Sequence, residues 1–164
     1  MRGLHRASAN DWSRIEDFQR AAYARTESIV GARAIPLEWD YCRILQECEV
    51  WLDEHDGLLM GVLILRMLEG ALFLESIATA PEAAGSGLGR ALLEATFERA
   101  RELGLRRVEL ITNSLNPALS WYKRKGFTVD LEEVQPGRTV IHMSMPVQDG
   151  LNRLRQKTAG SQLS

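Results

Sequence analysis

Residues 72–93 read LFLESIATAPEAAGSGLGRALL, an apolar strand that leads through a glycine-rich loop into an amphipathic helix. The loop has glycines at alternate positions, Gly85, Gly87 and Gly89, which removes side chains where a ligand would approach the backbone. The first N–H groups of the following helix are free to bind an anion. The spacing is neither G-x-G-x-x-G nor a loop that ends in Gly-Lys-Ser/Thr. The loop therefore predicts a phosphate-binding site that matches neither of these two known patterns.

A second motif, NPALSWYKRKGF at residues 116–127, lies farther along the chain. Together the two segments resemble the acetyl-CoA loop and the Asn…Ala…Tyr-x-x-x-Gly-Phe helix of the GCN5-related N-acetyltransferases, the GNAT family. The family's loop reads Arg/Gln-x-x-Gly-x-Gly/Ala, after a strand that often ends in Val-x-Pro-Glu; Pro81 and Glu82 supply the Pro-Glu here. The resemblance covers residues 1–146, and two motifs in the family's order make it specific.

The resemblance implies an α/β (α+β) protein with the GNAT fold. Such a fold has a mixed, mostly antiparallel sheet of about six to seven strands, splayed between strands 4 and 5 and flanked by about four helices. We expect helices that start at Asn10 or Asp11, at Pro36, at Leu88 and at Asn116. We expect strands at residues 2–7, 50–54, 58–67, 72–79, 107–113, 127–134 and 139–146.

The chain has 164 residues, of which 45% are hydrophobic and 26% charged, as in an ordinary globular domain. We expect a GNAT acetyltransferase domain at residues 1–146. Residues 147–164 form a more polar C-terminal tail. For this tail we favour weak order over the alternative, a short helix docked on the domain or on a partner subunit.

Charge, cysteine count and hydropathy argue against several classes of partner. The net charge of −2 speaks against a nucleic acid as the main partner. Cys42 and Cys48 are too few for a disulfide framework, and no Cys/His cluster predicts a metal site. No apolar run reaches the length of a membrane span, and the N-terminus lacks the apolar region of a signal peptide. We expect a cytoplasmic protein with no metal, nucleic-acid or membrane partner, and leave a homodimer open.

The resemblance implies acetyl-CoA as the co-substrate, held at the glycine-rich loop. Backbone N–H groups from Ser86 to Gly89 would face its pyrophosphate. Ala84 stands where the family has Arg or Gln and cannot donate a side-chain hydrogen bond. Arg90 could compensate, although a cation there opposes the helix dipole. The residues implied at the loop are Ala84, Gly85, Ser86, Gly87, Leu88, Gly89 and Arg90.

The resemblance also implies two groups of cofactor residues outside the loop. The backbone of Ile77, Ala78 and Thr79 would pair with the pantetheine amides like an added strand. An N–H of Ile77 or Ala78 could stabilise the oxyanion. Many relatives have an asparagine seven residues before the motif tyrosine. Here Asn116 lies six residues and Asn113 nine residues before it, and either could hold the cofactor.

Tyr122 is the candidate general acid. A tyrosine with a pKa of about 10 can return a proton to a thiolate, whose thiol has a pKa of about 8.5. The alternative is a tyrosine that packs beside Trp121 and Phe127.

Glu75 is the candidate base, acting through a water. It stands alone among apolar strand residues, where an unpaired carboxylate is costly to bury. Strict alternation puts it on one sheet face with Phe73 and Ile77. The alternatives are a charge at the edge of the split, a carboxylate paired with an arginine, or a base at Glu109 on the next strand instead.

Other side chains could shape the acceptor site. Of the histidines, we expect His55 to be exposed and His5 and His142 to be structural, although His142 could face the acceptor pocket. Three aromatic residues flank the region that shapes the acceptor site in relatives, where they would either stack on a substrate or pack in the core. They are Tyr23, Trp39 and Tyr41.

We therefore expect an acetyl-CoA-dependent N-acetyltransferase that passes the acetyl group directly to a primary amine of a small molecule. The family resemblance implies attack without an acyl-enzyme, and neither cysteine lies near the two motifs. The alternatives are a protein N-terminal or lysine acetyltransferase, and a non-catalytic acyl-CoA-binding module of the same fold.

Overall fold

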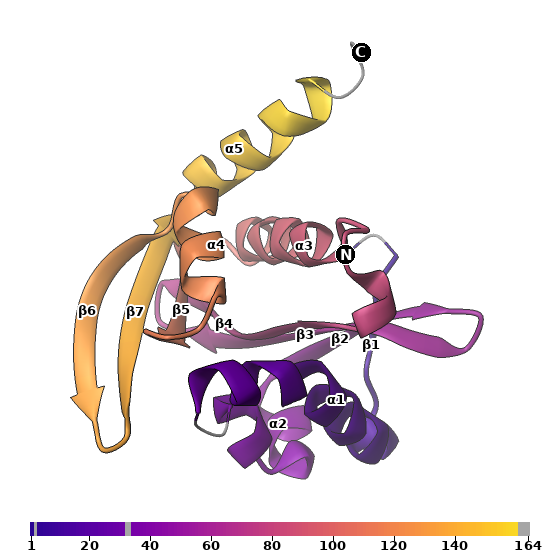
Figure 1. The fold of residues 1–164 in the computed structure, drawn as a ribbon. Helices are drawn as coiled ribbons and strands as arrows, with labels where there is room; N and C mark the ends of the chain where they lie inside the picture. The colour runs from indigo at the N-terminus through magenta and orange to yellow at the C-terminus, as the bar shows by residue number, and fades with distance from the viewer. Residues whose placement is uncertain (2, 32–33, 161–164) are drawn as a thin grey trace.

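A seven-stranded sheet separates two layers of helices in the computed structural model, which describes residues 1, 3–31 and 34–160 (Figure 1). The strand order is β1-β2-β3-β4-β5-β7-β6, and every neighbouring pair is antiparallel except β4 with β5. The strands are β1 (His5–Arg6), β2 (Glu49–His55), β3 (Leu58–Leu68), β4 (Ala71–Thr79), β5 (Arg107–Asn113), β6 (Thr128–Gln135) and β7 (Arg138–Pro146). The helices are η1 (Ala9–Asp11), α1 (Trp12–Val30), η2 (Ile35–Glu38), α2 (Tyr41–Glu47), η3 (Pro81–Ala83), α3 (Leu88–Glu102), α4 (Ala118–Lys125) and α5 (Val147–Gly160).

The predicted fold class is confirmed by this mixed, mostly antiparallel sheet. Each predicted strand is present; residue 2 of the first one and residues 161–164 of the predicted tail lie outside the described residues. Figure 1 shows α1 and α2 on one face of the sheet and α3 and α4 on the other. None of the helices in the described ranges combines the length and hydropathy that a membrane span needs.

The core lies on both faces of the sheet. Val62, Leu63, Ile64 and Leu65 are all fully buried, because helices cover both sides of the central strand β3. Their side chains alternate between two clusters. Leu63 and Leu65 pack with α3 residues such as Phe97, whereas Val62 and Ile64 pack with residues of α1 and α2.

The sheet splits between β4 and β5, as predicted. The two strands pair in parallel from Ala71 with Arg107 up to Leu74 with Leu110. Beyond that point β4 runs on to Thr79 and β5 to Asn113 without pairing. The split therefore leaves backbone groups of both strands open to a ligand.

A β-bulge lies where the split begins. Ile64 of β3 pairs with Ser76 and the next residue, Leu65, pairs with Leu74, so Glu75 is an extra residue in β4. The alternation expected for Glu75 therefore holds toward Phe73 and is wrong toward Ile77. Ile77 packs against the α3 side of the sheet, whereas Glu75 and Ser76 both bond to partners on the α1 and α2 side.

Two helices start later than predicted. Pro36 belongs to the separate turn η2, and α2 begins only at Tyr41. The reason is Asp40, whose carboxylate accepts the backbone N–H groups of Cys42 and Arg43 and so caps a new helix. The helix expected from Asn116 begins at Ala118, because the Asn116 side chain accepts the Ala118 N–H and forms the turn before it.

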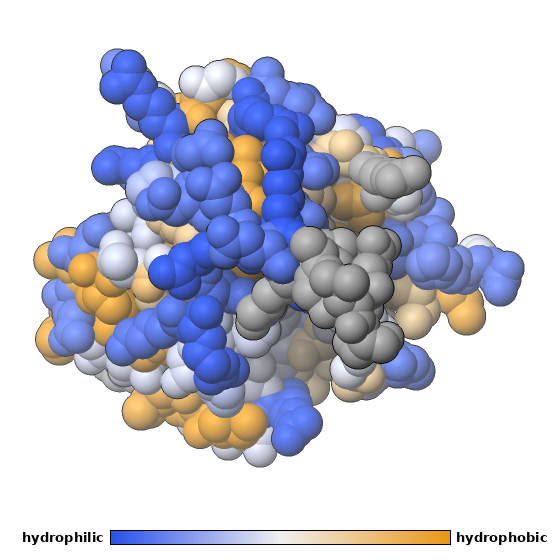
Figure 2. Space-filling view, turned by 90° about the horizontal axis from the view of Figure 1, so that it is seen from above, coloured by the Kyte–Doolittle hydropathy of each residue, from blue (hydrophilic) through white to orange (hydrophobic). Residues whose placement is uncertain are grey.

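The C-terminal segment forms a helix, α5, that follows β7 directly. Leu151 and Leu154 are buried in the core beside α3, and Gly150 lies against the Phe97 ring. The sequence leaves two alternatives for this segment, a weakly ordered tail and a short docked helix, and its described residues form the docked helix. Figure 2 views this face from above, and its surface is mainly hydrophilic, as expected for a helix that buries one side.

Gly150→Ala is expected to lower the free energy of unfolding by about 1–3 kcal/mol, as overpacked cores do. A Cβ atom at this position would overlap the Phe97 ring, which is itself fully buried, so that the packing would have to shift. Urea unfolding followed by circular dichroism measures the change. Gln156→Ala, an exposed position of the same helix, is the control and should stay within about 0.5 kcal/mol of wild type. A stabilised Gly150→Ala variant would contradict this packing.

Candidate active site

The open edge of β4 presents alternate backbone groups to the split. The Ala80 N–H donates to the Met60 carbonyl of β3 at 2.8 Å, so Ala80 and, two residues earlier, Ala78 turn their backbone groups toward β3. Ile77 and Thr79 turn theirs toward the split. The Tyr23 hydroxyl accordingly donates to the Ile77 carbonyl at 3.4 Å. Of the two N–H groups considered for an oxyanion, that of Ile77 faces the split.

The glycine-rich loop forms a cradle of backbone donors before α3. Gly85 and Gly87 have φ angles of 75° and 84°, in the left-handed region that favours glycine. The Ser86 N–H is used, since it donates to the Ala83 carbonyl at 3.1 Å. Within the described part of the chain, no acceptor is bound to the N–H groups of Gly87 and Gly89. The arrangement suits a phosphate group.

A cavity of about 600 Å³ lies against this loop, and its walls carry two cations. Arg90 lines it and also donates to the Leu154 carbonyl of α5 at 2.8 Å. Lys125 lines it from α4, with its Nζ 5.2 Å from the centre of the Trp121 ring. Ala84 lines the same cavity without a polar side chain.

Sequence reasoning missed Trp121 and Lys125 as residues of this site. A signal was available, because Lys125 follows Trp121 by four positions and Tyr122 by three, and such spacings share one face of a helix.

A second cavity, of about 260 Å³, lies on the other side of the split. Its walls come from α1, η2, β4, β5, α4 and the start of β7. Four residues line both cavities, so the two meet at the split: Ile77, Thr79, Ala118 and Tyr122.

Tyr122 projects from α4 to the junction of the two cavities. Burial, with a smaller effect of Tyr23, raises the pKa of Tyr122 well above its ordinary value. Its ring packs edge-on against Trp121 and Phe127, with centroids 5.0 and 5.5 Å apart. Tyr122 therefore packs beside Trp121 and Phe127, as the alternative interpretation expected, and it also lines both cavities. The hydroxyl stays protonated at neutral pH, as a general acid requires.

Glu75 lines the smaller cavity and is paired with an arginine. Its Oε1 lies 2.7 Å from the Nε of Arg66, which also reaches Glu47 of α2 at 3.2 Å. These two carboxylates raise the pKa of Arg66 and keep it charged. Glu109, the alternative base, is bound by Arg107 at 2.5 Å and lines neither cavity.

Asn113 ends β5, Asn116 lies in the turn before α4, and both line the smaller cavity. Each side-chain oxygen accepts a backbone N–H two residues on, from Leu115 and Ala118 respectively, at 2.9 Å. The oxygens are therefore used in shaping the turn.

A buried polar network supports the wall of the smaller cavity. Gln19 is fully buried and its Nε2 donates to the Ser76 hydroxyl at 3.1 Å. The Ser76 hydroxyl also lies 2.8 Å from that of Tyr23, which lines the cavity. Sequence reasoning missed Gln19 and Ser76, since the bulge that turns Ser76 toward α1 depends on strand pairing.

The remaining aromatic and histidine candidates divide into one residue that lines the smaller cavity and others that lie outside it. Trp39 lines the smaller cavity, whereas Tyr41 does not line it and is buried, with its hydroxyl donating to the Pro36 carbonyl at 2.8 Å. The three histidines line neither cavity, and each lies beside a carboxylate. The pairs are His5 with Glu54, His55 with Asp53 and His142 with Glu133. Among the described residues there is also no group of His, Cys, Asp and Glu that could hold a metal ion.

Comparisons with known proteins agree with this geometry. The acetyltransferase (GNAT) family model matches residues 12–127. A mycothiol acetyltransferase from Pseudarthrobacter chlorophenolicus is 51% identical over 53 residues, which make up 32% of this chain and only 16% of that protein. Nourseothricin acetyltransferase has a TM-score of 0.56 at 31% identity, covering 62% of this chain and 66% of that one. The PaiA N-acetyltransferase of Thermoplasma acidophilum, solved with coenzyme A, has a TM-score of 0.72 at 16% identity, covering 87% and 97%. Because the family model spans more than half of the sequence, the chain belongs to the GNAT family of acetyltransferases.

Proposed function

We propose that this protein is an acetyl-CoA-dependent N-acetyltransferase that transfers the acetyl group directly to a primary amine of a small molecule. The observation that carries the proposal is the meeting of two cavities at the split, one against the glycine-rich loop and one beside α1 and η2. Acetyl-CoA would supply the activated acetyl group. The N–H groups of Gly87 and Gly89 would hold its pyrophosphate, and the Ile77 N–H would stabilise the oxyanion.

The small volume of the second cavity favours a small-molecule acceptor over a protein. At about 260 Å³ and with walls from several elements, it is at the lower limit of small-ligand sites. Two relatives are named for the acetylation of mycothiol and nourseothricin, neither of which is a protein. A cytoplasmic location and a homodimer stay predictions of the sequence.

The deciding experiment is a panel of amines with acetyl-CoA, in which release of free thiol is measured. Thiol release with small amines supports the proposal. Activity confined to peptide N-termini or lysines would replace it with a protein acetyltransferase. Acetyl-CoA binding with no thiol release from any acceptor would replace it with an acyl-CoA-binding module.

Glu75→Gln is expected to lower turnover by about 10²-fold at acidic pH, the lower end of the range for general bases. A primary amine has a pKa of about 10, so nearly all of it must lose a proton there. Glu109→Gln is the matched control, since both carboxylates pair with an arginine and only Glu75 lines the cavity. Both pH–rate profiles are measured on one accepted amine. An unaltered profile for Glu75→Gln would reduce Glu75 to a partner of Arg66, and a defect only in Glu109→Gln would move the base to β5.

A further inference from the structure

The smaller cavity carries an arginine that the acetyl-transfer reaction does not need. Arg138, the first residue of β7, is the one cationic side chain among the described residues that line this cavity. The other lining groups are apolar or neutral except Glu75, whose charge is balanced by Arg66. A cation in the wall of an acceptor cavity can bind an anionic group of the acceptor.

The contacts of Arg138 hold it in place and leave part of the guanidinium available. Its Nε donates to the Gln135 side chain at 3.1 Å, and this hydrogen bond holds the guanidinium group in position. Its Nη1 lies 3.6 Å from the Glu38 carboxylate, beyond good hydrogen-bond distance. No other described residue binds its nitrogens. Since about half of the Glu38 side chain is exposed to water, this ion pair is weak and easily exchanged.

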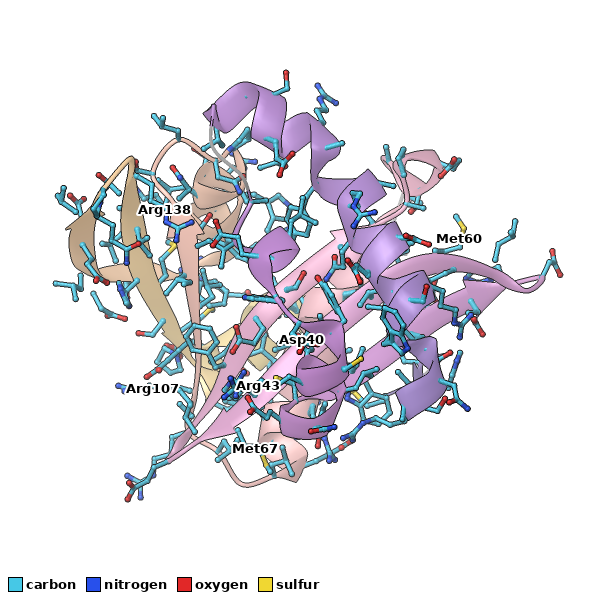
Figure 3. The ribbon with its side chains drawn as sticks, turned by 90° about the horizontal axis from the view of Figure 1, so that it is seen from below. Asp40, Arg43, Met60, Met67, Arg107 and Arg138 are labelled. Carbon is cyan, nitrogen blue, oxygen red and sulfur yellow. The ribbon has the colours of Figure 1, made fainter. Side chains whose placement is uncertain are left out.

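Arg138 stands at the far end of the cavity from the bulge at Glu75. On β5, pairing with β4 ends at Leu110, where the split opens, while Asn113 at the other end of the strand pairs with Val140. Arg138 lies two residues beyond Val140, at the open end of the split. Figure 3 shows Arg138 beside the β6–β7 hairpin, well apart from Arg107 at the other end of β5.

We propose that Arg138 anchors the carboxylate of the acceptor, so that the substrate class is compact amines that carry a carboxylate, such as amino acids. The inference rests on the proposed function. A guanidinium presents two parallel N–H groups that match a carboxylate. Because Arg138 and Ile77 line one cavity of about 260 Å³, a single small molecule can reach both with its two ends.

The test compares amino acids with their carboxamides, which keep the shape and lose the charge. Wild type is expected to favour the carboxylates by about 10- to 100-fold in kcat/KM, the usual worth of a hydrogen bond to a charged group. Arg138→Gln should remove that preference through KM, with kcat and the carboxamide kinetics little changed. Glu38→Gln should lower KM for the carboxylates, because it removes a competing anion.

Arg107→Gln is the matched control: it removes the same charge from an exposed arginine of the neighbouring strand, outside both cavities. It should leave both series unchanged. Equal use of carboxylates and carboxamides by wild type, or an equal loss of both in Arg138→Gln, would overturn the proposal.

The failure of the proposed function would look different. In that case no amine of either series would be acetylated, and the anchor would be tested by binding alone. Carboxylates should then raise the melting temperature of wild type more than that of Arg138→Gln, since a ligand stabilises the state it binds. Equal shifts in the two proteins would overturn the anchor in this case too.

Discussion

Gly87→Glu is expected to abolish acetyl-CoA binding while the protein remains folded. The φ angle of 84° and the open space around Gly87 place a new side chain outside the core, beside the free N–H donors of the loop. A carboxylate there would occupy the region proposed for the pyrophosphate and repel it. Calorimetry with acetyl-CoA measures the loss, and a left-handed glutamate costs about 1–2 kcal/mol of stability.

Gly104→Glu separates this repulsion from backbone strain. Gly104 lies just beyond the other end of α3 with a φ angle of 69°, also with open space around it, and lines neither cavity. The variant carries the same charge and a similar strain, and should bind acetyl-CoA like wild type. If folded Gly87→Glu binds acetyl-CoA with unchanged affinity, the loop is not the phosphate site.

The parts of the fold that were predictable are those whose signal is local in the sequence. The Asp56-Gly57 turn between β2 and β3 needs two positive φ angles, 52° and 76°, and Asp-Gly is a pair that adopts them readily. The glycine-rich loop is visible for the same reason, since its backbone geometry and its donors belong to one short segment. Such features depend on neighbours in the chain alone.

The features that escaped prediction depend on distant partners. The bulge at Glu75 exists only because of how β4 pairs with β3, and it changes which side chains face α1. The helix α5 is ordered because Gly150 packs against the Phe97 ring, which belongs to α3, a helix far away in the sequence. Arg138 has no motif around it, and only the topology brings β7 to the cavity beside η2.

Tyr122→Phe is expected to slow acetyl transfer by about 10²–10⁴-fold, the usual cost of losing a general acid. The variant removes only the hydroxyl of a residue that lines both cavities, and it keeps the ring packing against Trp121 and Phe127. The affinity for acetyl-CoA should therefore change little. Single-turnover rates are the proper measurement, because slow product release would hide the effect in steady state.

The pH dependence sharpens this prediction. Burial raises the pKa of Tyr122 above its ordinary value, so the wild-type hydroxyl keeps its proton across the neutral and mildly alkaline range. The ratio of wild-type to Tyr122→Phe rates should then be constant from about pH 6 to pH 9, below the ordinary tyrosine pKa of about 10. Tyr41→Phe is the control, since Tyr41 is also buried with a raised pKa but lines neither cavity. It should lose stability through the lost bond to Pro36 and keep its turnover. Equal single-turnover rates for wild type and Tyr122→Phe at every pH would leave Tyr122 as a packing residue, and the proton for the departing thiolate would have to come from solvent.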